Sequence, residues 1–69
     1  MKFNPYYYAR YLGAIELTGA IELNGVINWT WVTFADEATR RKFDTECRNN
    51  GYRVRDFGPC KTQYHHYQD

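Results

Sequence analysis

The chain has 69 residues, enough for one small domain. Nine lysines and arginines against eight aspartates and glutamates give a formal net charge of +1, which argues against a nucleic-acid mimic and provides no long-range field to attract polyanions. The sequence contains no apolar run of signal-peptide or membrane-spanning length. We therefore expect a single soluble domain over residues 1–69, with no membrane contact and a cytoplasmic location.

Aromatic residues are the unusual part of the composition. They make up 19% of the chain and include seven tyrosines, a composition typical of sheets and interfaces. Nothing in the composition indicates a haem, flavin or nucleotide, so we expect no cofactor. Domains of this length have stabilities of roughly 3–5 kcal/mol unless something reinforces them. Self-association or a bound partner could do so, whereas Cys47 and Cys60, outside any CxxC pattern, are predicted to be free thiols rather than a disulfide.

The first segment, residues 1–12, is rich in β-forming tyrosines. Tyr6, Tyr7, Tyr8 and Tyr11 favour a strand, and a strand is our prediction for this segment. The pair Asn4-Pro5 would also suit the start of a short helix, and Gly13 would end either element.

A long hairpin is predicted over residues 14–34. The sequence Gly-Ala-Ile-Glu-Leu occurs twice, from Gly13 and from Gly19, and its period of six keeps equivalent residues on one face of a strand. Asn24-Gly25 is the strongest short hairpin signal, because both central positions of a type I′ turn need positive φ. This turn pairs Leu23 with Val26 and predicts four further cross-strand pairs, which are Ile21 with Asn28, Gly19 with Thr30, Leu17 with Val32, and Ile15 with Phe34.

The two faces of this hairpin differ in character. The face that carries the four predicted pairs is largely apolar. The opposite face carries Trp29, Trp31 and Ile27 next to the acidic Glu16 and Glu22. We expect a helix to cover the first face and to leave the tryptophan face open.

That helix is predicted over residues 36–50. Asp36 can cap its start, Asn50-Gly51 can end it, and its apolar stripe consists of Ala38, Thr39, Phe43 and Cys47. A further strand is expected over residues 52–57, and the tail from Lys61 is expected to add an edge strand or to fray. The predicted fold class is α+β, an antiparallel sheet of three to five strands packed against one helix.

The sequence does not predict an enzyme. Glu16 and Glu22 lie six residues apart on one strand, roughly 20 Å by strand rise, which is too far to share a reaction centre. Cys47, Cys60, His65 and His66 could chemically bind zinc, but their spacing lacks the two-ligand knuckle of structural zinc sites. We therefore expect no catalytic and no metal site.

Protein binding is the function that the sequence favours. Tryptophan, tyrosine and arginine most often dominate interface energies, and the predicted contact residues are Trp29, Trp31, Ile27, Glu16, Glu22, Tyr7 and Tyr11. A second copy of the chain could cover the same tryptophans, which would make a homodimer. By type alone, and without a motif, such a domain suits a viral or mobile-element inhibitor that blocks a surface of a larger host complex.

Single-stranded nucleic-acid binding is the alternative function. Aromatic rings on a sheet can stack on bases, and the basic candidates are Arg40, Arg41, Lys42, Arg53 and Arg55. Against this alternative, Glu16 and Glu22 beside the tryptophans would repel phosphates. The two functions therefore predict different contact surfaces, the tryptophan face or the basic side chains.

Overall fold

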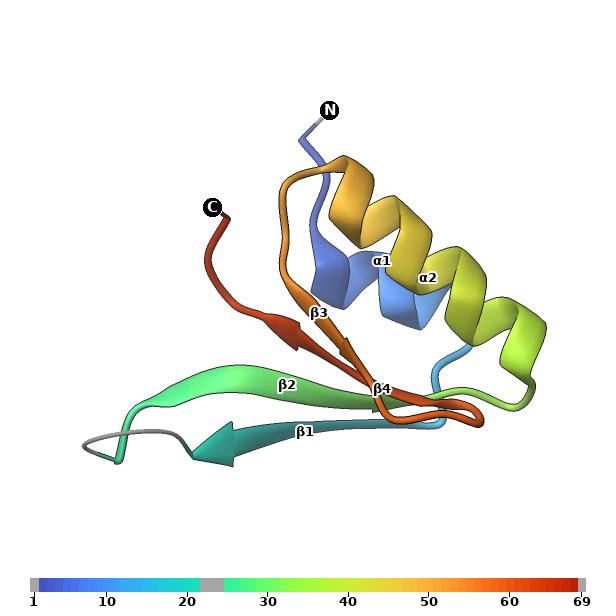
Figure 1. Cartoon of the computed structure of the whole chain (residues 1–69), viewed down its shortest axis with the longest axis horizontal. Coiled ribbons are helices and arrows are strands. Elements are labelled where there is room, and N and C mark those ends of the chain that lie inside the picture. Colours follow the sequence, from blue (N-terminus) through green and yellow to red (C-terminus); the bar gives the residue numbers. More distant parts are fainter. Residues whose placement is uncertain (1, 22–24, 69) are drawn as a thin grey trace.

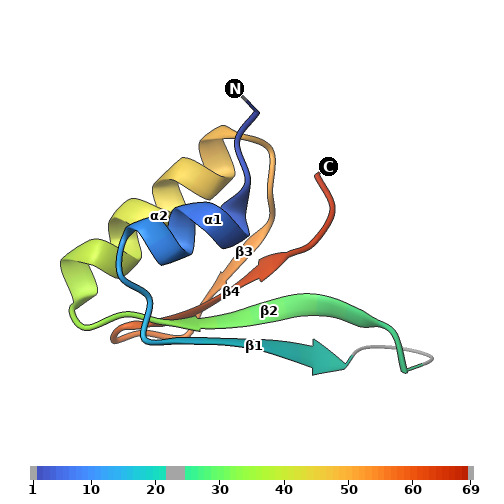
Figure 2. The same cartoon turned by 180° about the vertical axis from the view of Figure 1, so that it is seen from behind.

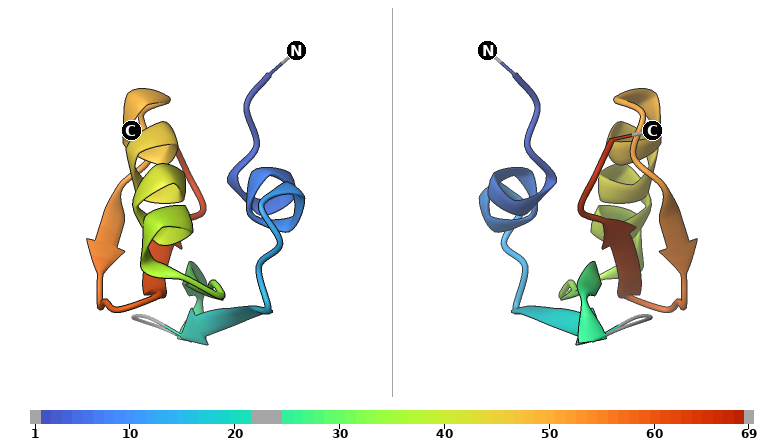
Figure 3. Two further views of the ribbon diagram at one scale, coloured as in Figure 1. Left: turned by 90° about the vertical axis from the view of Figure 1, so that its right-hand side faces the viewer. Right: turned by 90° about the vertical axis from the view of Figure 1, so that its left-hand side faces the viewer.

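The computed structural model describes residues 2–21 and 25–68, apart from the side chain of Ile27. The elements follow the order α1 (Pro5–Tyr11), β1 (Glu16–Ile21), β2 (Ile27–Thr33), α2 (Glu37–Asn49), β3 (Val54–Asp56) and β4 (Lys61–His65). The four strands form one antiparallel sheet in the order β1-β2-β4-β3. Both helices lie side by side on the same face of this sheet (Figures 1 and 3). The predicted α+β class is confirmed, with one helix more than expected.

The predicted hairpin is confirmed over most of its length. Leu17 pairs with Val32 and Gly19 with Thr30, as the turn predicts. At the tip the register shifts by one residue through a bulge, so that Ile21 pairs with Ile27 instead of Asn28. Asn24 of the predicted turn and Leu23, the predicted partner of Val26, lie outside the described residues. Gly25 has the positive φ of +73° that the prediction requires.

Residues 1–12 contain a helix, so the predicted strand is wrong. The side chain of Asn4 caps α1 by accepting hydrogen bonds from the backbone N–H of Tyr6 at 2.9 Å and of Tyr7 at 3.4 Å, and Pro5 occupies the first turn. Ala9 is the residue of this helix that enters the core. Local capping and this contact outweigh the β tendency of the tyrosines.

Helix α2 has the predicted bounds within one residue but buries a different stripe. Asp36 caps it by accepting hydrogen bonds from the backbone N–H and the hydroxyl of Thr39, both at 2.8 Å. The buried residues are Arg40, Phe43, Asp44 and Cys47, whereas Ala38 is exposed. An ion-pair cluster against β3 therefore replaces part of the expected apolar stripe.

The tail from Lys61 forms β4, which lies inside the sheet between β2 and β3 instead of at an edge. Its Tyr64 joins the core of Ala9, Val32, Phe34, Phe43 and Cys47 between the sheet and the helices. Both cysteines are free thiols, as expected. Neither helix of the described chain is long and apolar enough to cross a bilayer.

Candidate functional site

One face of the sheet is turned away from the two helices (Figure 2). Trp29 and Trp31 lie on this face, because they alternate along β2 with Val32, which faces the core. We call this face the open sheet face. Cross-strand pairing sets Trp31 beside Gln63 and Gln63 beside Arg55, while Trp29 pairs with His65. Side-chain contacts add further members, so that the central part of the face comprises Trp29, Trp31, Arg53, Arg55, Phe57, Lys61, Gln63 and His65.

Trp29 is covered by basic side chains. The guanidinium carbon of Arg55 lies 3.7 Å from the centroid of the indole ring, and that of Arg53 lies 5.7 Å away. The His65 ring meets the indole edge-on at 4.9 Å between centroids. Only 5% of Trp29 stays exposed, so this ring supports the arginines above it rather than offering its own surface.

Trp31 is more accessible and has a similar set of neighbours. Its ring lies 4.7 Å from that of Phe57, which is exposed, and the Lys61 ammonium lies 4.5 Å from its centroid. Aromatic rings and cations therefore alternate across this face. Each cation–π contact contributes about 0.5–1 kcal/mol at an exposed site, which helps to hold the basic side chains in place.

Gln63 lies beneath this layer, between Trp31 and Arg55. It is buried, and its Oε1 accepts no hydrogen bond from the described residues. A buried amide oxygen without a donor is costly. Gln63 is therefore part of the support of this face and does not contact a ligand directly.

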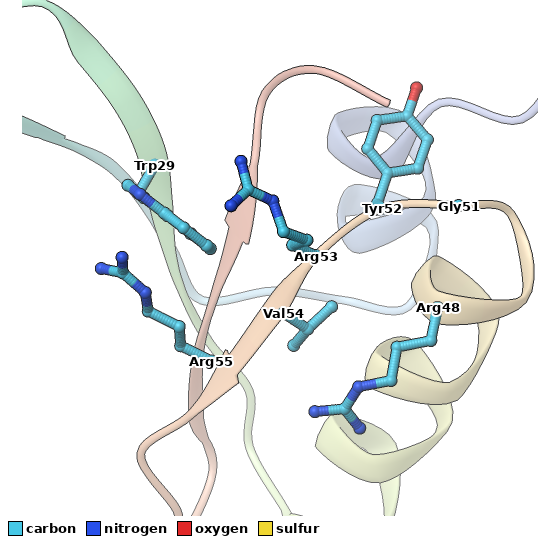
Figure 4. A pocket seen from close by; sticks show the side chains of 7 residues that line it. All are labelled: Trp29, Arg48, Gly51, Tyr52, Arg53, Val54 and Arg55. Atoms are coloured by element: carbon cyan, nitrogen blue, oxygen red, sulfur yellow. The ribbon is translucent and has the colours of Figure 1, made fainter. Parts of the chain in front are cut away.

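The described side chains of this face carry a net positive charge. Arg53, Arg55 and Lys61 are exposed, and the carboxylate described on the face, Glu16, lies at the end of the edge strand β1, where it accepts a hydrogen bond from Thr33 at 3.5 Å. Next to Trp29 a pocket of about 530 Å³ runs along β3, lined in part by Arg48, Arg53 and Arg55 (Figure 4).

The predicted protein-binding residues do not form one surface. Trp29, Trp31 and Glu16 belong to the open sheet face, but Tyr7 and Tyr11 lie on α1, in the layer on the other side of the sheet. Glu22 is outside the described residues, and of Ile27 only the backbone is described.

The predicted basic residues are also divided. Arg53 and Arg55 reach the open sheet face, while Arg41 and Lys42 are exposed on α2 in the opposite layer. Arg40 is not available for binding, which corrects the prediction. It is buried with two 2.7 Å bonds to Glu37, one of 2.7 Å to Asp56 and a further bond to Asp44.

This buried cluster explains two pKa shifts. Burial raises the pKa of Asp44 to about 7. The hydrogen bonds from the Arg40 side chain and from the Cys60 backbone N–H lower the pKa of Glu37 to about 2. Arg40 therefore connects α2 to β3 and has a structural role.

Sequence reasoning missed Phe57, Lys61 and Gln63. The signal was present, because Lys61, Gln63 and His65 alternate as one face of a strand should. The tail was not assigned to the interior of the sheet, so this alternation was not combined with that of the hairpin. In the zinc set, Cys47 is buried in the core, and the described part of the chain contains no group of three His, Cys, Asp or Glu residues suited to a metal ion.

Comparisons with protein-family models, with curated proteins and with solved structures find no match to this chain. Its function is therefore inferred from the open sheet face itself.

Proposed function

We propose that this protein binds single-stranded nucleic acid on the open sheet face. The observation that supports this function is the packing of three exposed cations against two indole rings on one side of a sheet. Arg53 and Arg55 contact Trp29, and Lys61 contacts Trp31. Binding sites for single strands combine positive charge along the backbone with flat surfaces on which bases stack.

Each side chain has a role in this proposal. One base stacks on Trp31 with Phe57 against its edge. The guanidinium of Arg55, whose central carbon lies 3.7 Å from the Trp29 centroid, is the platform for a second base. Arg53 and Lys61 contact the phosphates.

Glu16 opposes this function less than its sequence position suggested. Glu16 lies at the sheet edge, hydrogen-bonded to Thr33, while the tryptophan neighbours on the inner strand β4 are Gln63 and His65.

Bases in a duplex are already stacked on one another and cannot stack on a protein ring, so a flat aromatic sheet favours a single strand.

Fluorescence anisotropy with fluorescein-labelled 12-nucleotide oligo(dT) and oligo(rU) tests the proposal. The wild type is expected to bind at low salt and to weaken as salt rises. The variant Arg53→Ala with Arg55→Ala is expected to bind at least tenfold more weakly. It should also lower the slope of log K against log[salt] by about 0.7, the value for the one phosphate contact that Arg53 makes.

The variant Arg41→Ala with Lys42→Ala is the matched control. It removes the same charge from the opposite layer of the molecule. We expect it to retain affinity within about threefold, because only long-range charge is lost. Equal losses in the two double variants, or no binding by the wild type at low salt, would reject the open sheet face as a nucleic-acid site.

Protein binding is a second proposal, and a separate observation favours it. Tyr7, Tyr11 and Ile15 are 68%, 82% and 69% exposed on and just after α1. Exposed tyrosines are frequent anchors of protein interfaces. If the protein inhibits a larger host complex, it would bind that complex through this surface. A pull-down repeated after nuclease treatment should keep its partner, and Tyr7→Ser with Tyr11→Ser should lose it. A partner lost on nuclease treatment contradicts this second function.

A further inference from the structure

A second pocket lies on the helix side of the sheet, where α1 leaves the hairpin uncovered. Its volume is about 480 Å³, and the residues that matter for its chemistry are Tyr6, Gly19, Thr30, Tyr52, Tyr64 and His66. This volume is within the range of roughly 300–1,000 Å³ typical of small-molecule sites. The pocket is on the opposite side of the sheet from Trp29 and Trp31 and is thus independent of the proposed function.

Gly19 makes room for this pocket. The helix-side positions of β1 alternate as Leu17, Gly19 and Ile21, so one large side chain is missing between two apolar ones. The cross-strand partner of Gly19 is Thr30, whose side chain also lines the pocket. Positive φ angles occur at Gly13, Gly25 and Gly51, whereas Gly19 continues an extended strand. No backbone strain therefore requires glycine at position 19.

The walls of the pocket are aromatic and uncharged. Tyr6, Tyr52 and Tyr64 contribute rings, and no Asp, Glu, Lys or Arg lines the pocket in the described part of the chain. Phe3 packs against Tyr52 with 6.0 Å between ring centroids, and Phe43 packs against Tyr64 at 5.9 Å. These contacts hold two of the rings in place from behind.

Polar atoms gather at one side of the pocket. The hydroxyl of Thr30 shares a hydrogen bond with Nε2 of His66 at 2.5 Å, and Tyr64 is the cross-strand neighbour of Thr30 on β4. Burial raises the pKa of Tyr64 and lowers that of His66, so both groups favour their neutral forms at pH 7. The pocket therefore offers hydrogen bonds without charge.

We propose that this pocket binds one uncharged, planar heteroaromatic ring of nucleobase type, which stacks on the tyrosine rings and bonds to the Thr30 and His66 side chains. An uncharged wall selects against phosphates and carboxylates, because nothing compensates their desolvation. Aromatic walls with a few convergent polar groups suit a flat ring that carries N–H and C=O groups. The ring could belong to a free nucleoside or to a base within a strand.

NMR titration of the ¹⁵N-labelled protein tests this site. Adenosine, guanosine, cytidine and uridine are each added up to about 10 mM, an upper limit set by millimolar affinities expected for small ligands. We expect saturable shifts of the Gly19, Thr30 and Tyr64 amide signals with at least one nucleoside. In a parallel arm a 12-nucleotide strand is added, and shifts at these amides with the strand and not with the nucleosides assign the ring to a base in a strand.

Gly19→Val fills the pocket and is expected to reduce nucleoside affinity at least tenfold without lowering Tm, because valine is a better strand residue than glycine. Thr18→Val is the control, since it places a valine at the neighbouring position, whose side chain lies on the open sheet face and not in the pocket. Arg53→Ala with Arg55→Ala should leave nucleoside binding unchanged. No saturable shift with any nucleoside or strand, shifts confined to the open sheet face, or equal affinity in Gly19→Val would overturn the proposal.

Discussion

The guanidinium of Arg55 lies over the indole of Trp29, with 3.7 Å between the guanidinium carbon and the ring centroid. Arg55 belongs to the edge strand β3 and Trp29 to β2, and β4 lies between them. The contact therefore reaches across β4, so that the Arg55 side chain covers the Trp29 ring near the centre of the open sheet face. It makes Trp29 part of the support of this face and leaves Trp31 as its accessible indole.

Truncation of the two tryptophans should consequently have different effects. Trp29→Ala is expected to lower the free energy of unfolding by about 3 kcal/mol, in the range for a large buried aromatic side chain. Trp31→Ala should lower it by roughly half as much, because its ring is only partly buried, yet should weaken oligonucleotide binding by about 1–3 kcal/mol through the loss of base stacking. Urea denaturation and anisotropy measure the two quantities. Equal stability losses would contradict the distinction between support and contact.

The hairpin and α2 could be predicted because their signals are local. Gly25 and the alternation on either side of it set the register, and the Asp36 cap sets the start of the helix. Helix α1 was missed because a short capped turn competed with three consecutive tyrosines, and the deciding contact of Ala9 with the core is not local. Sequence patterns within one segment cannot show which distant surface will bury that segment.

For the same reason, the sequence predicts two parts of the candidate site, the tryptophans and the arginines, but not that they lie side by side. The sequence predicts Trp29 and Trp31 on an open face of the hairpin, and Arg53 and Arg55 within a separate strand over residues 52–57. What brings them together is the insertion of β4 between β2 and β3, a long-range pairing with no turn signal to indicate it. Likewise, Arg40 had the sequence environment of an exposed basic residue, and its burial depends on Asp56 from a strand that follows α2.

Arg40→Met should strongly destabilise the fold. The substitution keeps much of the buried volume but leaves Asp44 and its acidic neighbours without their common cation, and loss of one partner from a buried ion pair costs about 3–5 kcal/mol. Arg41→Met is the control, because this side chain is 73% exposed with one 3.5 Å contact to Glu37 and should cost less than about 1 kcal/mol. Guanidinium denaturation of both variants tests the difference. A similar small loss in each would mean that the cluster does not stabilise the protein.

Asp44→Asn should change how stability depends on pH. The folded chain holds the proton on Asp44 more tightly than the unfolded chain, because burial raises this pKa from 3.8 to about 7. Ionisation of Asp44 therefore lowers the free energy of unfolding as pH rises from about 4 to about 7. Glu37 acts in the other direction, since its pKa is lowered from 4.5 to about 2 and the stability it contributes is lost as pH falls below 4.5.

Thermal unfolding followed by circular dichroism from pH 3 to 8 can separate these contributions. Burial lowers the pKa of His66, so this residue increases the free energy of unfolding as pH rises toward 6.5. The wild type and Asp44→Asn share this contribution, so it cancels when their Tm values are subtracted. The Tm of wild type minus that of Asp44→Asn should fall steadily between pH 4 and 7 and change little above. A difference that stays constant over this interval would show that Asp44 does not titrate there.

The two thiols should differ in reactivity. Cys47 is fully buried among core residues, and burial raises its pKa to about 12, so almost no thiolate is present at pH 8. Cys60 is only half-buried in the loop before β4. Brief treatment of the native protein with iodoacetamide, followed by intact-mass and peptide mass spectrometry, should add one label at Cys60, and labelling in 6 M guanidinium should add two.

Cys47 becomes reactive only when the core opens, so its labelling rate follows the equilibrium population of the open state. In Arg40→Met this population, and with it the labelling rate, should rise about 150-fold for a loss of 3 kcal/mol in the free energy of unfolding. Rapid modification of Cys47 in the native wild type would contradict the core that packs α2 onto the sheet.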